Sequence, residues 1–160
     1  MHYSVMTSPS GAAPFDPRTL LAESRLGILA TIKADGRPQL SPVTPFYDPG
    51  TGLIHVSMTE GRAKTVNLRR DPRISLMWED GLDYNELRGV TVTGKAEIID
   101  SGPELIDLMR VCVQRNAPML KGEALEQHVA HMARKRVVVA VRPEKTMSWD
   151  HRKLAALKSA

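Results

Sequence analysis

The sequence has little cysteine and few aromatic residues, and both scarcities limit what the chain can be. Cys112 is the only cysteine among 160 residues, which excludes an internal disulfide and is typical of a reducing compartment. Its apolar surroundings, residues 108–113, predict a packed thiol rather than a nucleophile. Aromatic residues make up 4% of the chain, so aliphatic side chains and eight methionines must fill the core.

Long hydrophobic runs are also missing. No stretch approaches the roughly 20 apolar residues that span a bilayer, so we expect no membrane partner. Residues 1–14 have neither a basic start nor an apolar segment, which argues against a secretion signal. Their Ser, Pro, Gly and Ala content predicts a flexible tail ahead of a single domain over residues 15–160. A cytoplasmic location follows as an expectation.

Positive charge is present but local. The formal net charge is +4 and the pI about 9.4, and five basic residues fall between Arg62 and Arg73. A nucleic-acid surface needs a wider basic stripe with interleaved aromatic residues, which the sequence lacks. The pattern favours a small anionic ligand and no nucleic-acid partner.

Alternating apolar residues and turn signals predict a mainly β (α+β) domain. No G-x-G-x-x-G follows a strand, which argues against a βαβ nucleotide-binding fold. Strands joined by tight turns favour an antiparallel barrel or half-barrel. We expect six strands, at about residues 26–32, 38–43, 53–57, 74–78, 90–99 and 137–141. We expect helices ending near residue 24, before Pro72 and before Pro118, and one over about residues 123–134.

Local signals refine this outline. Asp16 or Thr19 can cap the first helix, and Ser101 with Glu104 has the pattern of a capping box. The prolines at positions 42 and 45 predict that residues 38–43 form an edge strand. Gly94 is expected to mark a bulge, and Trp149 to begin a polar C-terminal tail.

The stretch from Ser57 to Arg73 is the strongest functional signal. A β-branched run leads into Gly61, and a short helix follows. Arg62 lies where the helix opens, and Lys64 and Asn67 share one helical face. Free N–H groups, a positive helix end, a guanidinium and an ammonium suit a bound phosphate. The alternative is a surface helix with a solvated basic face.

Other candidates are weaker. His128 and His131 lie three apart on a helix, but no acidic or cysteine partner has a suggestive spacing, so no metal site is predicted. Trp149 and His151 could reach over a ligand, although a tryptophan near a chain end is more often a packing anchor. No residue pair suggests a catalytic acid and base, and the catalytic residues stay unassigned.

Two motifs together resemble a known family. They are Gly27–Lys33 with Asp35–Ser41, and Arg62–Thr65 with Asn67–Arg73. In this order they resemble the flavin-binding split-barrel superfamily that includes pyridoxamine 5′-phosphate oxidase, and within it the actinobacterial branch that uses the deazaflavin coenzyme F420. The resemblance implies a six-stranded antiparallel split β-barrel of the FMN-binding type with flanking helices. It also implies a homodimer with cofactor sites between the subunits.

The resemblance further implies where the cofactor binds. Its phosphate would be held at Ser57, Arg62, Lys64 and Asn67, and its ring would lie along the second strand. The full implied cofactor-binding set is Gln39, Leu40, Ser41, Pro42, Ser57, Met58, Arg62, Ala63, Lys64 and Asn67. Oxidase-type members have an arginine directly before the lysine, whereas Ala63 separates the two here, which favours F420 over FMN.

By this resemblance the chain is an F420-dependent oxidoreductase that transfers a hydride between the coenzyme and an unsaturated or heteroaromatic molecule. The cofactor would carry the difficult chemistry, and the protein would supply position and electrostatics. Two alternatives stay open. One is an FMN-dependent oxidase, and the other is a non-catalytic protein that binds F420 or heme.

Overall fold

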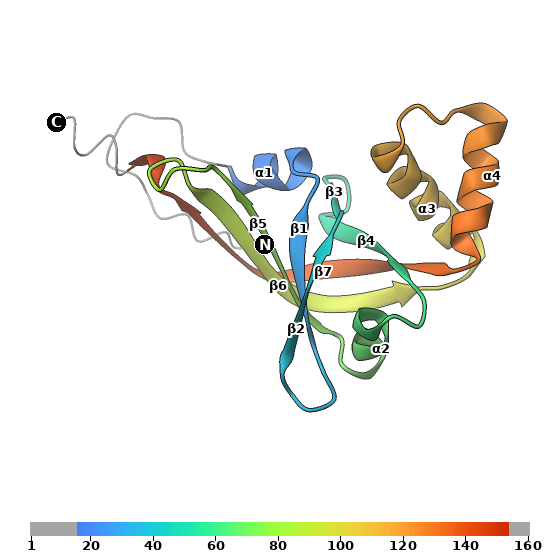
Figure 1. Cartoon of the computed structure of the whole chain (residues 1–160), viewed down its shortest axis with the longest axis horizontal. Coiled ribbons are helices and arrows are strands. Elements are labelled where there is room, and N and C mark those ends of the chain that lie inside the picture. The colour runs from blue at the N-terminus through green and yellow to red at the C-terminus, as the bar shows by residue number, and fades with distance from the viewer. Residues whose placement is uncertain (1–15, 154–160) are drawn as a thin grey trace.

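A computed structural model describes residues 16–153, which form a curled antiparallel sheet flanked by four helices (Figure 1). The strand order is β2-β1-β5-β6-β7-β4-β3. The strands are β1 (Gly27–Ile32), β2 (Pro38–Val43), β3 (Phe46–Asp48), β4 (Leu53–Thr59), β5 (Arg73–Asp80), β6 (Arg88–Ile99) and β7 (Arg136–Asp150). The helices are α1 (Pro17–Glu23), α2 (Ala63–Arg70), α3 (Gly102–Asn116) and α4 (Gly122–Ala133).

The predicted mainly β, half-barrel architecture is confirmed, with seven strands instead of six. The additional strand, β3, is three residues long and pairs with β4 at one edge of the sheet. So short a strand has too few residues to show an alternating pattern, which is why the sequence did not reveal it. The tail predicted for residues 1–14 lies outside the described residues.

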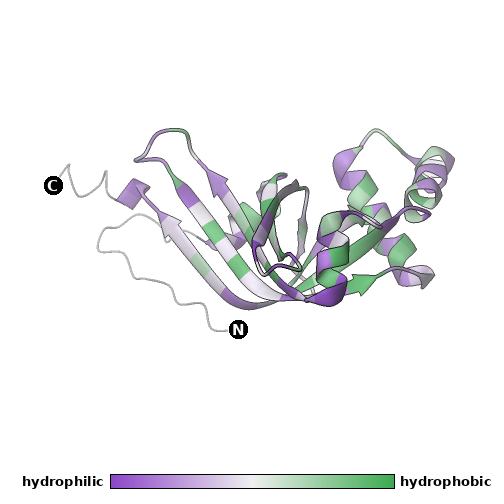
Figure 2. Ribbon diagram, turned by 60° about the horizontal axis from the view of Figure 1, so that its bottom comes forward, coloured by the Kyte–Doolittle hydropathy of each residue, from purple (hydrophilic) through white to green (hydrophobic). Residues whose placement is uncertain are grey.

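Strand alternation builds the main core. In the paired strands β1, β5 and β6, Leu29, Leu76 and Val92 occupy one cross-strand row and are almost fully buried. Trp78, predicted to be a core residue, is 1% exposed. Figure 2 shows the hydrophobic and hydrophilic residues alternating along the long strands. Burying one face in this way fixes the register, because a slip of one residue would turn every apolar side chain outward.

The register of β2 decides which of its residues face inward. β2 is an edge strand, as predicted, and pairs only with β1. Gln39 and Ser41 lie opposite the buried residues Thr31 and Leu29, so they share the inner face. Leu40 and Pro42 alternate with them and are exposed on the outer face.

The two longest strands, β6 and β7, pair along their whole length and cross the bulge predicted at Gly94. Their register shifts between Thr93 and Gly94. A β-carbon at Gly94 would collide with the backbone oxygen of Arg142, so the close approach of the strands requires glycine. β7 continues to Asp150. The prediction that Trp149 begins a tail is therefore wrong, because its polar neighbours lie on an exposed part of a strand.

Helix ends agree in part with the sequence signals. Asp16 caps α1 through a bond from the Arg18 N–H, as predicted. The capping box predicted at Ser101 does not form. The Ser101 hydroxyl instead donates to Asp100 Oδ1 at 3.3 Å, and no side chain caps α3.

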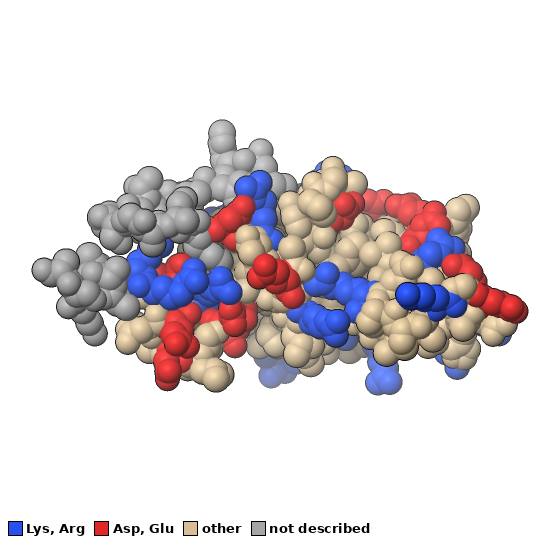
Figure 3. All heavy atoms as spheres, turned by 90° about the horizontal axis from the view of Figure 1, so that it is seen from above, with Lys and Arg blue, Asp and Glu red and all other residues tan. Residues whose placement is uncertain are grey.

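The pair formed by α3 and α4 packs against β4 and β7 and makes a second apolar cluster around Met109. Arg110 of α3 links the two helices by pairing with Glu126 of α4 at 2.8 Å, and it also pairs with Asp107 of its own helix at 2.8 Å. Basic and acidic side chains are interspersed over the face seen in Figure 3. No helix within residues 16–153 is long and apolar enough to cross a membrane.

Candidate functional site

A hollow opens where the end of β4 and the start of β7 meet β2 and the start of α2. Its volume is about 850 Å³ including its mouth. We call it the anion hollow, and its lining residues are Gln39, Ser41, Met58, Thr59, Arg62, Ala63, Lys64 and Arg136. Six of these belong to the set predicted from sequence, and Thr59 and Arg136 are additional.

The turn from β4 into α2 gives the hollow its backbone donors. β4 ends at Thr59, Gly61 turns the chain with a φ of 75°, and α2 begins at Ala63. The Thr65 hydroxyl donates to the Thr59 carbonyl at 3.0 Å and fixes this turn. The first N–H groups of α2 have no partner inside the helix, and no side chain caps them. They add a positive helix end to the anion hollow.

Three cations surround the anion hollow without a matching carboxylate. Arg62 and Lys64 come from the start of α2, and Arg136 from the start of β7. Within residues 16–153 neither Arg62 nor Lys64 forms an ion pair, and none of the lining residues is acidic. Partial burial lowers the pKa of Lys64, and the nearby charges of Arg136 and Arg62 lower it further. The site is therefore charged to receive an anion.

Arg136 is held in one orientation by uncharged oxygens of β4. Its Nε donates to Ser57 Oγ at 2.8 Å, its Nη2 to the Ser57 carbonyl at 3.0 Å, and its Nη1 to Thr59 Oγ1 at 3.4 Å. These bonds orient the guanidinium but leave its charge unneutralised. Sequence reasoning missed Arg136 because its place depends on the pairing of Thr59 with Arg136 across β4 and β7.

Asn67 lies behind the anion hollow and does not line it. Its side chain is buried, and Nδ2 donates to Thr31 Oγ1 and to Gln39 Oε1, both at 3.0 Å. Because the Gln39 oxygen is occupied in this way, its Nε2 group is the end left to donate to a ligand. Asn67 thus positions Gln39.

The other predicted site residues lie elsewhere. Leu40 and Pro42 are exposed on the outer face of β2. Ser57 lines a neighbouring cavity beneath α3 and α4. His128 lines that same cavity, and no group of three or more His, Cys, Asp or Glu that could hold a metal occurs among the described residues. His151 contacts Tyr84, with their ring centroids 4.6 Å apart.

Three other basic residues, Arg69, Arg70 and Arg88, are engaged in contacts. Arg69 pairs with Glu60 and Asp100, Arg88 pairs with Asp80, and Arg70 donates to the Ile32 carbonyl. Arg69 and Arg88 thus have carboxylate partners, which Arg62, Lys64 and Arg136 lack within residues 16–153. This contrast favours the anion hollow as the place for an external anion. A phosphate or a similar group matches its donors.

Comparison with known proteins agrees with this fold. A conserved hypothetical protein from Mycobacterium tuberculosis has a solved structure that superposes with a TM-score of 0.76 and 39% identity, covering 86% of this chain and 84% of that one. An F420 reductase structure superposes with a TM-score of 0.64, covering 84% of this chain and 98% of that one. At 22% identity it shows the fold alone.

A curated relative and a family model connect the chain to named proteins. The F420H2-dependent biliverdin reductase of Mycobacterium tuberculosis (strain CDC 1551 / Oshkosh) is 34% identical to this chain over 74 residues. The aligned residues cover 46% of this chain and 54% of the reductase, so the chain matches about half of the length of that relative. The model of the pyridoxamine 5′-phosphate oxidase family matches residues 17–150. The match spans most of the chain and the whole of the anion hollow, so the chain belongs to the pyridoxamine 5′-phosphate oxidase family.

Proposed function

We propose that this protein is an F420-dependent oxidoreductase that transfers a hydride between the deazaflavin coenzyme and an unsaturated or heteroaromatic molecule. The observation that carries the proposal is the anion hollow, with three unneutralised cations beside the start of a helix. Family membership and the F420H2-dependent relative support it. The Ala63 spacer between Arg62 and Lys64 favours F420 over FMN.

The residues present fit the phosphate-bearing end of such a coenzyme. Arg62, Lys64 and Arg136 would hold its phosphate together with the free N–H groups of α2. Gln39 and Ser41 would lie beside its ring system, with Gln39 presenting an amide donor. A reduced deazaflavin bound there would supply the hydride, and these side chains would bind it and fix its orientation, from which much of the rate gain would arise.

A second copy of the chain would complete the site. The outer face of the sheet carries a cross-strand row whose exposed apolar members are Ile28, Met77 and Met147. Ile28 lies opposite Met77, and the half-buried Thr91 lies between Met77 and Met147. We propose that this row forms the homodimer interface, with the cofactor sites between the subunits. Light scattering should give the dimer mass, and Met77→Glu should shift the protein toward monomer. A wild-type monomer at all concentrations would contradict the proposal.

Coenzyme titration tests the function directly. We expect oxidised F420 to bind the purified protein saturably and more tightly than FMN. Reduced F420 should be consumed with at least one member of a panel of conjugated and heteroaromatic compounds, with biliverdin as the first member because the curated relative is named for it. Tighter binding of FMN would favour the oxidase, and tight F420 binding without turnover would favour a non-catalytic binder.

A further inference from the structure

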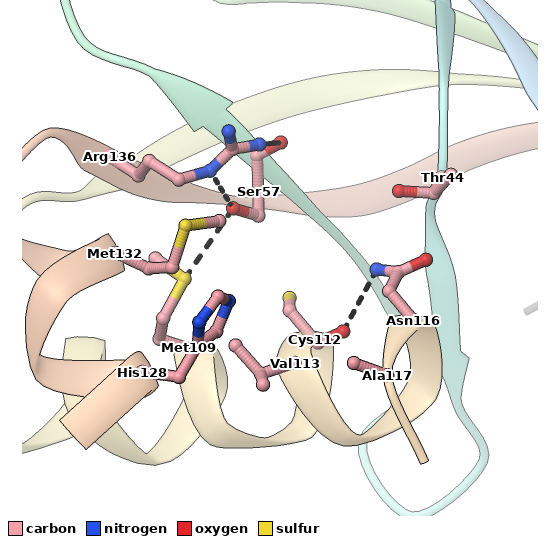
Figure 4. A pocket seen from close by; sticks show the side chains of 10 residues that line it. All are labelled: Thr44, Ser57, Met109, Cys112, Val113, Asn116, Ala117, His128, Met132 and Arg136. Carbon is pink, nitrogen blue, oxygen red and sulfur yellow. Dashed lines mark hydrogen bonds between the residues drawn. The ribbon is translucent and has the colours of Figure 1, made fainter. Parts of the chain in front are cut away.

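A second cavity lies directly beside the anion hollow, between β4 and the pair α3 and α4 (Figure 4). Its volume is about 80 Å³, or about 360 Å³ when the open space at its mouth is included. We call it the sulfur cavity, and its lining residues are Thr44, Ser57, Met109, Cys112, Val113, Asn116, Ala117, His128, Met132 and Arg136. Ser57 and Arg136 separate it from the anion hollow.

The wall formed by α3 and α4 is soft and mainly apolar. Figure 4 shows the sulfur atoms of Met109, Cys112 and Met132 gathered around the cavity, with Val113 beside them. Burial raises the pKa of the Cys112 thiol to about 11, so the thiol stays neutral and adds no negative charge. Thioether sulfur makes favourable contacts with aromatic rings. This wall therefore suits a small aromatic ring.

The opposite wall supplies a single fixed charge. Arg136 is the only lysine or arginine among the lining residues, and none of them is acidic. A guanidinium has five N–H donors, of which Arg136 uses three on Ser57 and Thr59. Two N–H donors of Arg136 remain. The Ser57 hydroxyl, which accepts from Arg136 Nε, donates in turn to Met109 Sδ at 3.6 Å. An oriented, incompletely satisfied cation facing a mainly apolar wall suits a carboxylate.

We infer that the sulfur cavity is a second binding site, which takes a small monocyclic aromatic acid. The ring would lie against Met109 and Met132, and the carboxylate would meet Arg136. This site is distinct from the anion hollow, but the two share one guanidinium. Anions in the two sites therefore compete for the same charge, and each weakens the binding of the other.

Methionine methyl groups provide a separate reporter for each site. Met58 lines the anion hollow, whereas Met109 and Met132 line the sulfur cavity. In the full-length protein labelled with 13C at the methionine methyl groups, benzoate should shift the Met109 and Met132 signals saturably and leave Met58 unchanged. Benzyl alcohol, which has the ring without the charge, should bind at least about tenfold more weakly. Inorganic phosphate should shift Met58 and raise the benzoate concentration needed for half-saturation.

Two variants separate the carboxylate contact from the ring contact. Arg136→Gln should weaken benzoate binding at least about tenfold. Ala117→Leu fills the cavity and leaves Arg136 in place, so it should abolish the benzoate shifts and preserve the phosphate shift at Met58. Val111→Leu, on the exposed side of α3, the helix that ends just before Ala117, is the matched control and should bind benzoate normally.

Three outcomes would contradict the proposed binding of an aromatic acid in the sulfur cavity. Benzoate shifts at Met58 alone, no saturable shift at Met109 or Met132, or unchanged benzoate binding in Ala117→Leu would each overturn the inference. None of these measurements uses a deazaflavin. Failure of the sulfur cavity proposal is therefore distinguishable from failure of the proposed coenzyme function.

Discussion

The basic residues at the two ends of helix α2 differ in whether they have carboxylate partners. At its C-terminal end Arg69 pairs with Glu60 at 2.9 Å and with Asp100 at 3.2 Å. At its N-terminal end Arg62 and Lys64 face the anion hollow without a carboxylate. Arg69 thus has two carboxylate partners, whereas the described residues offer none to Arg62 or Lys64. At the start of α2, a bound anionic ligand would supply the negative charge that Arg62 and Lys64 lack.

The largest expected effect is on coenzyme binding. Lys64→Ala should weaken F420 binding by about 1.5–3 kcal/mol, the scale of a hydrogen bond to a charged group, while the fold survives. Isothermal titration measures the affinity, and circular dichroism checks the fold. Arg69→Ala removes the same charge from the same helix and is the control, with an affinity close to wild type. An equal loss of F420 affinity in Lys64→Ala and Arg69→Ala would contradict the proposed difference between the two ends of α2.

The next effect separates a binding residue from a positioning residue. Asn67→Ala leaves the Thr31 hydroxyl and the Gln39 carbonyl without their donor, so the free energy of unfolding should fall by about 1–3 kcal/mol. Urea denaturation measures this loss. Lys64→Ala should show no comparable loss. An Asn67→Ala protein of normal stability with affinity reduced as far as in Lys64→Ala would make Asn67 a direct ligand contact.

The smallest effect concerns the stability of the ligand-free protein. Lys64→Met removes a charge that lies near Arg136 and Arg62, so it should stabilise the protein by a few tenths of a kcal/mol at neutral pH, because solvent screens most of the repulsion. Arg110→Met breaks the pairs with Asp107 and Glu126, so it should destabilise the protein. Thermal unfolding of both variants beside wild type measures the difference.

The stability difference between Lys64→Met and the wild-type protein should depend on pH. The pKa of Lys64 is lowered in the folded protein from its ordinary value of 10.5. Between the lowered value and 10.5 the unfolded chain binds more protons than the folded one, so wild-type stability rises with pH in this window. The advantage of Lys64→Met should therefore shrink as the pH approaches 10. An advantage that grows with pH would contradict the lowered pKa.

Local patterns predicted the elements of this fold well. The edge position of β2 and the bulge at Gly94 follow from proline geometry and strand alternation, and the structure confirms both. The basic start of α2 was also visible, because Arg62 and Lys64 are neighbours in sequence.

Features that depend on long-range pairing were not predictable. Arg136 enters the anion hollow only because β7 pairs with β4, and nothing in the short run before Val137 specifies that partner. The role of Asn67 was misplaced for a related reason. Helical spacing put it on the same face as Lys64, but tertiary contacts with Thr31 and Gln39 turn its amide away from the hollow. Alternation along β2 likewise divides the four predicted ring contacts between two faces.

The burial of Cys112 has a practical consequence. The only thiol of the chain lies on the buried face of α3, and at neutral pH it carries almost no thiolate, the form that attacks oxidants and disulfides. Two folded copies should therefore not become cross-linked through it in air. A cysteine introduced on the surface would then be the preferred target for a maleimide dye, which makes this chain a convenient background for single-site labelling.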